Sequence, residues 1–388
     1  MDEVISVQIS RKELDCWCED KAEEHYLLLK QLAAIPAPSH HEQKRAEFIQ
    51  KWLLSNGVKT VTIDDALNIV VPFCCSEDSP LLLCMAHTDV VFPDTDPLPV
   101  REEKGRLYAP GVGDDTANVV AMMLCIRFLV THPGVYERPT LFVFNSCEEG
   151  LGNLKGTRQI MADYGSRIAE MVSFDLQSDS IITRAVGSER WEIEVSTAGG
   201  HSYGNFGNAN AIHRLSELVC KLYQQQIPEK DNTKTTFNIG TVFGGTSVNT
   251  IAQSACMTYE YRSDDPDCLE QMACQFRRIL AEQDQQKAQF SVKPIGKRPC
   301  GMKIPGELHR KLIHRCADAI RAVYAIEPVL LSGSTDANIP LSLGIPAVTF
   351  GLYRGGGAHT RQEYIETDSL TPGLKIALYF LLQENITE

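Results

Sequence analysis

The sequence predicts an α/β protein in which a smaller α+β domain interrupts a larger domain. Short apolar runs alternate with helical patterns over residues 1–185 and again over residues 297–388, which is typical of a sheet flanked by helices. The order of elements changes over residues 186–296. The chain has 388 residues, and 43% of them are hydrophobic, so both domains can have well-packed cores.

The elements of the larger domain follow one another along the chain. Helices are expected near residues 20–34 and 42–56, from about 117 to 130, and near 307–325. Apolar, strand-like runs lie at Asn68–Pro72, Leu81–Ala86, Thr140–Asn145, Met171–Phe174 and Ala347–Gly351. Together these elements make one sheet with helices between its strands.

The interrupting segment has the order strand, helix, strand, strand, helix, strand. The elements expected from its apolar patterns are Arg190–Thr197, Ala209–Gln226, Thr235–Phe243, Gln253–Arg262, Pro266–Gln283 and a final strand. This βαββαβ order is that of a ferredoxin-like sandwich. The sequence therefore predicts a ferredoxin-like domain inserted at residues 186–296.

Composition disfavours several kinds of partner. The net charge is −13, whereas a nucleic-acid surface needs a clustered basic face. The first 24 residues lack the apolar core of a signal peptide, and no later stretch has the length of a membrane span, so we expect a soluble, cytoplasmic protein. Several of the thirteen cysteines lie in apolar runs, which favours reduced thiols. The motifs of serine hydrolases and of phosphate-binding loops do not occur.

Five residues that can bind a metal ion follow apolar runs or a glycine turn: His87, Asp114, Glu149, Asp175 and His359. Ligands in open α/β sheets gather where the strands end. Four of the five candidates stand at such ends, and the glycine turn can bring the fifth close to them. The sequence therefore predicts a two-metal hydrolase site.

Acidic neighbours of these candidates suggest further roles. Asp89 follows the first histidine by two residues, on the same side of an extended segment, and can hold its imidazole. Asp115 can cap the helix that begins after the glycine turn. Glu148 and Glu149 are adjacent carboxylates at a buried strand end, where cations or protons must neutralise them. One can bind metal while Glu148 accepts the proton of the attacking water.

The interrupting segment also carries polar loops with glycines, at Gly199–Ser202 and Gly244–Thr250. Such loops can be simple hairpins or can approach a ligand closely. His201 can stabilise the oxyanion of a tetrahedral intermediate, and Asn249 and Arg262 can hold a substrate carboxylate.

These motifs resemble, in order and separation, those of the dinuclear zinc metallopeptidases typified by peptidase T, carboxypeptidase G and the aminoacylases. The motifs that carry the resemblance are His87-Thr88-Asp89, Gly113-Asp114-Asp115, Glu148-Glu149-Gly150, Asp175, Gly200-His201-Ser202 and Ala358-His359. The resemblance implies a mixed sheet flanked by helices that binds two divalent metal ions, zinc first, with cobalt or manganese as alternatives. It also implies that the inserted domain is a lid and a homodimer interface.

The resemblance assigns each candidate ligand to a metal. Asp114 would bridge the two ions. His87 and Asp175 would complete one site, and Glu149 and His359 would complete the other.

The resemblance also assigns the catalytic roles. Glu148 would be the general base, Asp89 the orienter of the first histidine, and His201 a transition-state donor that in many relatives reaches the partner subunit's site. Thr116 and Asn118 depart from the Lys and Gly that the family often has there, but neither position supplies a metal ligand.

The motifs indicate which type of bond is hydrolysed, but they define the substrate less closely. The segment Ser334–Asn338 and the Gly355–Gly357 loop resemble those of peptidase-T-like relatives, which favours a zinc exopeptidase, an aminopeptidase of di- or tripeptides, with Gly357 near the substrate. An N-acyl-amino-acid deacylase or desuccinylase is the alternative. A catalytically silent binding or assembly protein is the alternative of another class, and the intact Glu148 argues against it.

Overall fold

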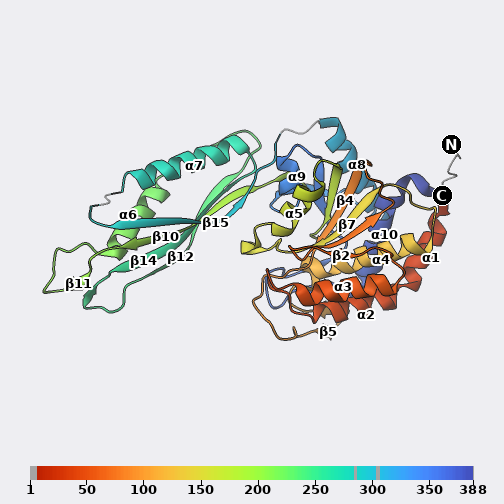
Figure 1. The fold of residues 1–388 in the computed structure, drawn as a ribbon, viewed down its shortest axis with the longest axis horizontal. Coiled ribbons are helices and arrows are strands. Elements are labelled where there is room, and N and C mark those ends of the chain that lie inside the picture. Colours follow the sequence, from red (N-terminus) through yellow and green to blue (C-terminus); the bar gives the residue numbers. More distant parts are fainter. Residues whose placement is uncertain (1–6, 284–285, 303–305, 388) are drawn as a thin grey trace. The chain divides into compact units, whose positions relative to one another are not determined.

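The computed structural model describes residues 7–283, 286–302 and 306–387. The chain forms two compact units, one made of Met1–Arg184 and Lys303–Glu388 and the other of Ala185–Met302 (Figure 1). The second unit is therefore a continuous insertion into the first. The predicted α/β class, with a mixed sheet and an inserted α+β unit, is confirmed.

The first unit is built on an eight-stranded mixed sheet. From edge to edge its strands are β16 (Val329–Gly333), β9 (Ser180–Ala185), β17 (Ala347–Phe350), β8 (Ile168–Phe174), β4 (Leu81–His87), β7 (Thr140–Asn145), β3 (Ile69–Phe73) and β2 (Thr62–Ile63). The four central strands, β17, β8, β4 and β7, are parallel to one another. Their side chains are almost all buried, as expected for parallel strands covered on both faces. Their carboxyl ends therefore meet at one edge of the sheet.

Helices cover this sheet. They are α1 (Arg11–Asp20), α2 (Ala22–Ala33), α3 (Gln43–Ser55), α4 (Asn118–Thr131), α5 (Lys155–Tyr164), α8 (Gly306–Tyr324), α9 (Asn338–Ser342) and α10 (Leu370–Leu382). Helices α4 and α10 contact each other and are buried almost all round, because their sequences are apolar on every face. No helix of the described residues is long and apolar enough to cross a membrane.

A second, antiparallel sheet of the first unit joins two segments that lie far apart in the sequence. Its strands are β18 (Gly355–Gly356), β19 (Tyr364–Glu366), β6 (Arg106–Tyr108) and β5 (Arg101–Glu103). Strand β19 pairs with β6, with Ile365 opposite Leu107. The loop between β18 and β19 is thereby held beside the turn that follows β6.

The second unit has the predicted βαββαβ order. Its elements are β10 (Gly187–Ser196), α6 (Ala211–Tyr223), β12 (Thr235–Gly244), β14 (Ser254–Ser263), α7 (Pro266–Ala281) and β15 (Gln289–Arg298). The sheet has the order β12-β14-β10-β15 with antiparallel neighbours, so the ferredoxin-like prediction is confirmed. Alternate residues of β14 are buried against the two helices, and Asp265 caps α7 through the N–H groups of Asp267 and Cys268.

Candidate metal centre

The five candidate ligands of the first unit converge at the carboxyl ends of its parallel strands. His87 is the last residue of β4, Asp175 directly follows β8, and Glu149 lies four residues after the end of β7. Asp114 lies on the turn before α4, and His359 lies on the loop between β18 and β19. Three groups have ligand atoms within 4.8 Å of one another: His87, Asp114 and Asp175; His87, Glu148 and Glu149; and Asp114, Glu149 and His359.

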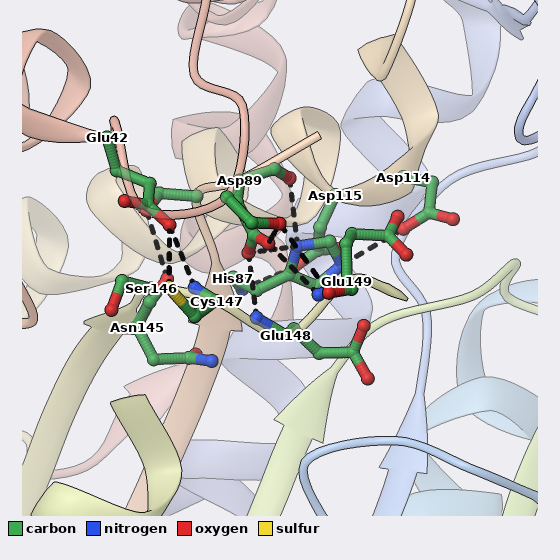
Figure 2. A network of polar contacts seen from close by, with 12 residues as sticks. Glu42, His87, Asp89, Asp114, Asp115, Asn145, Ser146, Cys147, Glu148 and Glu149 are labelled. Carbon is green, nitrogen blue, oxygen red and sulfur yellow. Dashed lines mark hydrogen bonds and ion pairs between the residues drawn. The ribbon is translucent and has the colours of Figure 1, made fainter. Parts of the chain in front are cut away.

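The carboxylate of Asp114 lies between two imidazoles. Its Oδ1 is 3.0 Å from Nε2 of His87, and its Oδ2 is 3.1 Å from Nε2 of His359 (Figure 2 labels Asp114 and His87). The same nitrogen of His359 lies 3.3 Å from Oε1 of Glu149. Each oxygen of Asp114 thus faces a different histidine, which is the arrangement of a carboxylate that can bridge two cations.

Crowded carboxylates dominate the electrostatics of this cluster. Burial and the charge of Asp114 raise the pKa of Asp175 well above its ordinary value, and burial raises the pKa of Glu149 to about 7. Burial also acts to raise the pKa of Asp114, but hydrogen bonds with His359 and His87 hold that pKa below its ordinary value. Hydrogen bonds with Asp114 and Glu149 raise the pKa of His359 to about 11.

This donor set fits two divalent cations. Four carboxylates and two imidazoles share one cluster, and imidazole with carboxylate oxygen is a donor set that suits zinc and similar divalent metals. Cations would compensate the like charges that raise the carboxylate pKa values. Because the cluster contains more negative groups than its histidines can balance, the residues present are compatible with a dinuclear centre.

Asp89 fixes the loop that carries the two adjacent glutamates. Its Oδ1 accepts a hydrogen bond from the backbone N–H of Glu148 at 2.9 Å, and its Oδ2 accepts from the N–H of Glu149 at 3.0 Å and from the hydroxyl of Ser39 at 2.6 Å (Figure 2). Nδ1 of His87 lies 3.1 Å from the backbone oxygen of Asp89 and 3.5 Å from its Oδ1. Asp89 thus contacts His87 mainly through its carbonyl group, while its carboxylate holds the glutamate loop.

Glu42, which no motif of the sequence marks, extends this arrangement by one residue. Its buried Oε1 accepts hydrogen bonds from the backbone N–H groups of Cys147 and His40, both at 3.0 Å, and from the thiol of Cys147 at 3.3 Å (Figure 2). Two buried carboxylates therefore hold three consecutive amides, at residues 147–149. The sequence offers no signal for this contact, because the two partners are 105 residues apart.

Asp115 does not cap the helix that follows it, so that expectation was wrong. Its Oδ2 accepts a hydrogen bond from the backbone N–H of His87 at 2.8 Å, and its Oδ1 accepts from Nδ2 of Asn118 at 2.6 Å. The carbonyl oxygen of the Asn118 side chain accepts in turn from the N–H of Leu352, two residues after β17. Asn118, one of the departures from the family pattern, thus ties Asp115 to the end of a neighbouring strand. The peptide bond between Asp114 and Asp115 is cis.

Gly357 shapes the loop that bears His359. Its φ of 75° lies in the left-handed region, and its carbonyl oxygen accepts a hydrogen bond from the N–H of Thr360 at 3.0 Å. A Cβ at this position would lie 3.1 Å from the carbonyl oxygen of Gln362, so the tight loop favours glycine.

In the second unit, His201 and Asn249 lie on adjacent loops. The short strands β11 (Gly200–His201) and β13 (Thr250–Ile251) pair, and the N–H of Ser202 donates to the carbonyl oxygen of Asn249 at 3.0 Å. The imidazole of His201 is exposed, and its Nδ1 accepts from the N–H groups of Tyr203 and Gly204, both at 3.2 Å. An accepting Nδ1 leaves Nε2 of the neutral ring to carry the proton.

Arg262 of the second unit already has a carboxylate partner. Its Nε and Nη2 lie 3.0 Å from the two oxygens of Glu260, in a bidentate pair. A substrate carboxylate at Arg262 would therefore compete with Glu260. Arg190 lies 3.3 Å from the same carboxylate, so Glu260 has a second cation beside it.

Comparisons with known proteins agree with this architecture. Residues 83–383 match the family model of peptidase family M20/M25/M40. A succinyl-diaminopimelate desuccinylase of Corynebacterium glutamicum is 24% identical over 366 residues, which cover 92% of this chain and 95% of the relative. Solved structures of a tripeptidase from Staphylococcus aureus and of aminopeptidase PepT from Bacillus cereus share the fold, with TM-scores of 0.73 and 0.72 and identities of 20% and 18%. Each of these two alignments covers 93% of this chain and 98% of the other.

Proposed function

Because the chain belongs to peptidase family M20/M25/M40 and is a hydrolase of peptide or other linear amide bonds, we propose that it is an exopeptidase of di- and tripeptides, acting as an aminopeptidase. One observation carries the proposal: a carboxylate with an imidazole on each side lies next to a buried pair of glutamates. The similarity of the fold to a tripeptidase supports the choice of substrate.

The same geometry suggests how the ligands would be divided between two divalent ions, with zinc as the first choice and cobalt or manganese as alternatives. Asp114 would bridge the ions, His87 and Asp175 would complete one site, and Glu149 and His359 would complete the other. Bound cations of this kind polarise the scissile carbonyl group and make water more acidic.

Glu148 is proposed as the general base. Its backbone N–H is fixed by Asp89, and the amide before it is fixed by Glu42, so the loop that carries its carboxylate is held from both sides. The carboxylate would accept a proton from the attacking water and donate it to the nitrogen of the leaving amine.

Residues of the second unit would complete the site. His201 would donate its Nε2 proton to the developing oxyanion, because its Nδ1 is already an acceptor. Asn249 and Arg262 would hold a substrate carboxylate, and Gly357 of the first unit would leave room for the substrate backbone. These roles require the second unit to act as a lid.

The second unit is also the proposed homodimer interface. Strand β12 lies at the edge of its sheet, and Val242 and Phe243 on that strand are exposed. Edge strands with exposed apolar side chains readily pair with another chain. We expect wild-type protein to be dimeric by light scattering after gel filtration, and Phe243→Glu to shift it towards monomer. A monomeric wild type would refute the interface.

A deacylase is the second candidate, because the desuccinylase relative matches this chain along nearly its whole length. The deciding experiment measures metal content per chain together with hydrolysis of dipeptides, tripeptides and N-acyl amino acids, N-succinyl-diaminopimelate included. Each activity is measured before chelation, after chelation, and after zinc or cobalt is returned.

Two metals per chain with restorable peptide cleavage are the expected result. Cleavage of N-acyl amino acids alone would replace the peptidase proposal by the deacylase. If the protein bound no metal under any loading condition, the remaining alternative would be a catalytically silent binding or assembly protein.

A further inference from the structure

The turn that carries Asp114 and the loop that carries His359 are joined by a buried carboxylate. We propose that this residue, Glu363, is a positioning residue that fixes Asp114 between the two histidines and so sets the affinity of the centre for its pair of divalent cations. This inference rests on the proposed metal centre, and it concerns a residue that is not itself a candidate ligand.

Three backbone N–H groups of the turn donate to Glu363. Its Oε2 accepts from the N–H of Gly111 at 2.9 Å, and its Oε1 accepts from the N–H groups of Gly113 and Asp114, both at 2.8 Å. Glu363 is buried, with 2% of the residue exposed. An ionised carboxylate offers only acceptors, so it matches three converging donors that water does not reach.

A second residue, Tyr353, also packs against the turn. A Cβ on Gly113 would lie 2.6 Å from the ring and hydroxyl of Tyr353, so the backbone of the turn lies directly against this aromatic side chain. Gly111 has a φ of 71°, which favours glycine. The backbone before Asp114 is thus held by Tyr353 and by the carboxylate of Glu363.

Glu363 also belongs to the loop of the second histidine. It lies four residues after His359, and its own N–H donates to the carbonyl oxygen of Thr360 at 3.2 Å. The next residues form β19, which pairs with β6 just before the turn. One carboxylate and one strand pair therefore fix the distance between Asp114 and His359, two groups that must face the same cation.

Replacement of Glu363 by Gln tests this role with almost no change of size. One of the two oxygens becomes an NH₂ group, which would face an N–H donor of the turn. Either orientation of the amide sets its NH₂ group against an N–H of the turn, so the turn must shift, and we expect this shift to move Asp114. Loss of a residue that orients metal ligands typically weakens metal binding by about 10- to 100-fold, and we expect a loss of this size for E363Q.

The experiment is a cobalt titration of the full-length, metal-free protein, followed by calorimetry and by visible absorption. Wild type should bind two cobalt ions per chain. E363Q should bind them about 10- to 100-fold more weakly, with an altered cobalt spectrum, while the metal-free proteins give the same circular dichroism. Glu366→Gln is the matched control, because Glu366 lies only three residues further on, at the end of β19, but pairs with the partly exposed residues Arg106 and Arg354.

The outcomes separate this inference from the proposed function. Unchanged affinity and spectrum in E363Q would overturn the positioning role, and so would a lower melting temperature with an unchanged cobalt spectrum. Failure of wild type to bind cobalt would overturn the metal centre itself. If E363Q does not fold, Glu363→Asp decides: its shorter carboxylate should give weaker cobalt binding, and wild-type binding by Glu363→Asp would refute the proposal.

Discussion

The candidate metal centre of the first unit and the polar loops of the second unit contain the same kinds of residue in opposite settings. His87 is buried at the end of a parallel strand, and ligand atoms from three other segments lie within 4.8 Å of it. His201 is exposed, and its ring accepts hydrogen bonds from two amides of its own loop. A sheet brings side chains from distant segments to one place, whereas the ring of His201 is held only by amides of its own loop. Variants of the first region should therefore change metal binding, and variants of the second should change turnover alone.

The largest effect is expected for a residue of the first region whose variant should still bind metal. Glu148 lies in the cluster but is proposed to move a proton, so Glu148→Gln should bind two metals and lose turnover. Removal of general acid–base catalysis typically costs about 10²- to 10⁴-fold in kcat. Steady-state kinetics and metal analysis on the same preparation check this. Wild-type turnover by E148Q would show that another group accepts the proton.

The loss of a ligand should act differently. His87→Ala removes an imidazole from the buried cluster and leaves Asp114 without one of its two histidine neighbours. We expect fewer than two metals per chain and a loss of activity that added zinc partly restores. Metal analysis after dialysis against a zinc buffer measures the occupancy. Full occupancy in this variant would contradict the assignment of His87 as a ligand.

The next effect belongs to the second unit. His201→Ala should lower kcat by about 10²- to 10³-fold, the usual cost of losing a donor to a developing oxyanion, and should leave metal content unchanged. His213→Ala is a matched control, because His213 is an exposed histidine of the same unit on α6, 3.8 Å from Glu217. Loss of metal in H201A would break the contrast between the two regions.

A smaller effect is expected where a carboxylate acts through the backbone. Glu42→Ala removes the acceptor of two backbone amides, so the loop with Glu148 should shift, and misplacement of a catalytic group by about 1 Å can cost up to about 10²-fold. Glu42→Gln should be close to wild type, because both amides donate to the same oxygen, Oε1. Equal losses of kcat in the two variants would show that the charge of Glu42, rather than its hydrogen bonds, is needed.

These regions also show how far the sequence can predict the molecule. Strand ends such as His87 and Asp175 are visible in the sequence, because a buried strand is a continuous apolar run and its last residue can be counted. The βαββαβ order of the insertion follows from the same apolar patterns. Both kinds of prediction depend only on local sequence.

The remaining features depend on contacts across long separations. Glu363 meets Gly111 across 252 residues, and no local pattern distinguishes it from a surface glutamate. The sheet formed by β5, β6, β18 and β19 has strands of two or three residues, which are too short for an alternation pattern. Asp115 was expected at a helix cap because Asp is common there, but in the fold its carboxylate lies closer to the N–H of a neighbouring strand. Tertiary contacts decide these cases.

The smallest effect is expected for His25, which is compared with His87 because both are buried histidines of the first unit. Burial would lower the pKa of His87, but the charge of Asp115 and hydrogen bonds with Asp114 and Asp89 raise it instead. His25, on α2, is equally buried, and neither of its ring nitrogens has a hydrogen-bond partner among the described residues. Burial lowers the pKa of His25 from 6.5 to about 4. The pKa of a buried histidine is thus raised inside the cluster, at His87, and lowered outside it, at His25.

The sign of the resulting pH dependence follows from which state of the protein binds the proton. Above pH 6.5, His25 is neutral whether the chain is folded or unfolded, so it adds no pH dependence. As the pH falls from 6.5 to about 4, His25 binds a proton in the unfolded chain but not in the folded chain. The free energy of unfolding therefore falls by on the order of 3 kcal/mol. His25→Leu should remove this loss. Denaturant unfolding of both metal-free proteins between pH 7 and pH 4 should therefore show a stability difference that moves in favour of His25→Leu as the pH falls. A difference that stays constant over this range would mean that His25 binds its proton equally well in the folded chain.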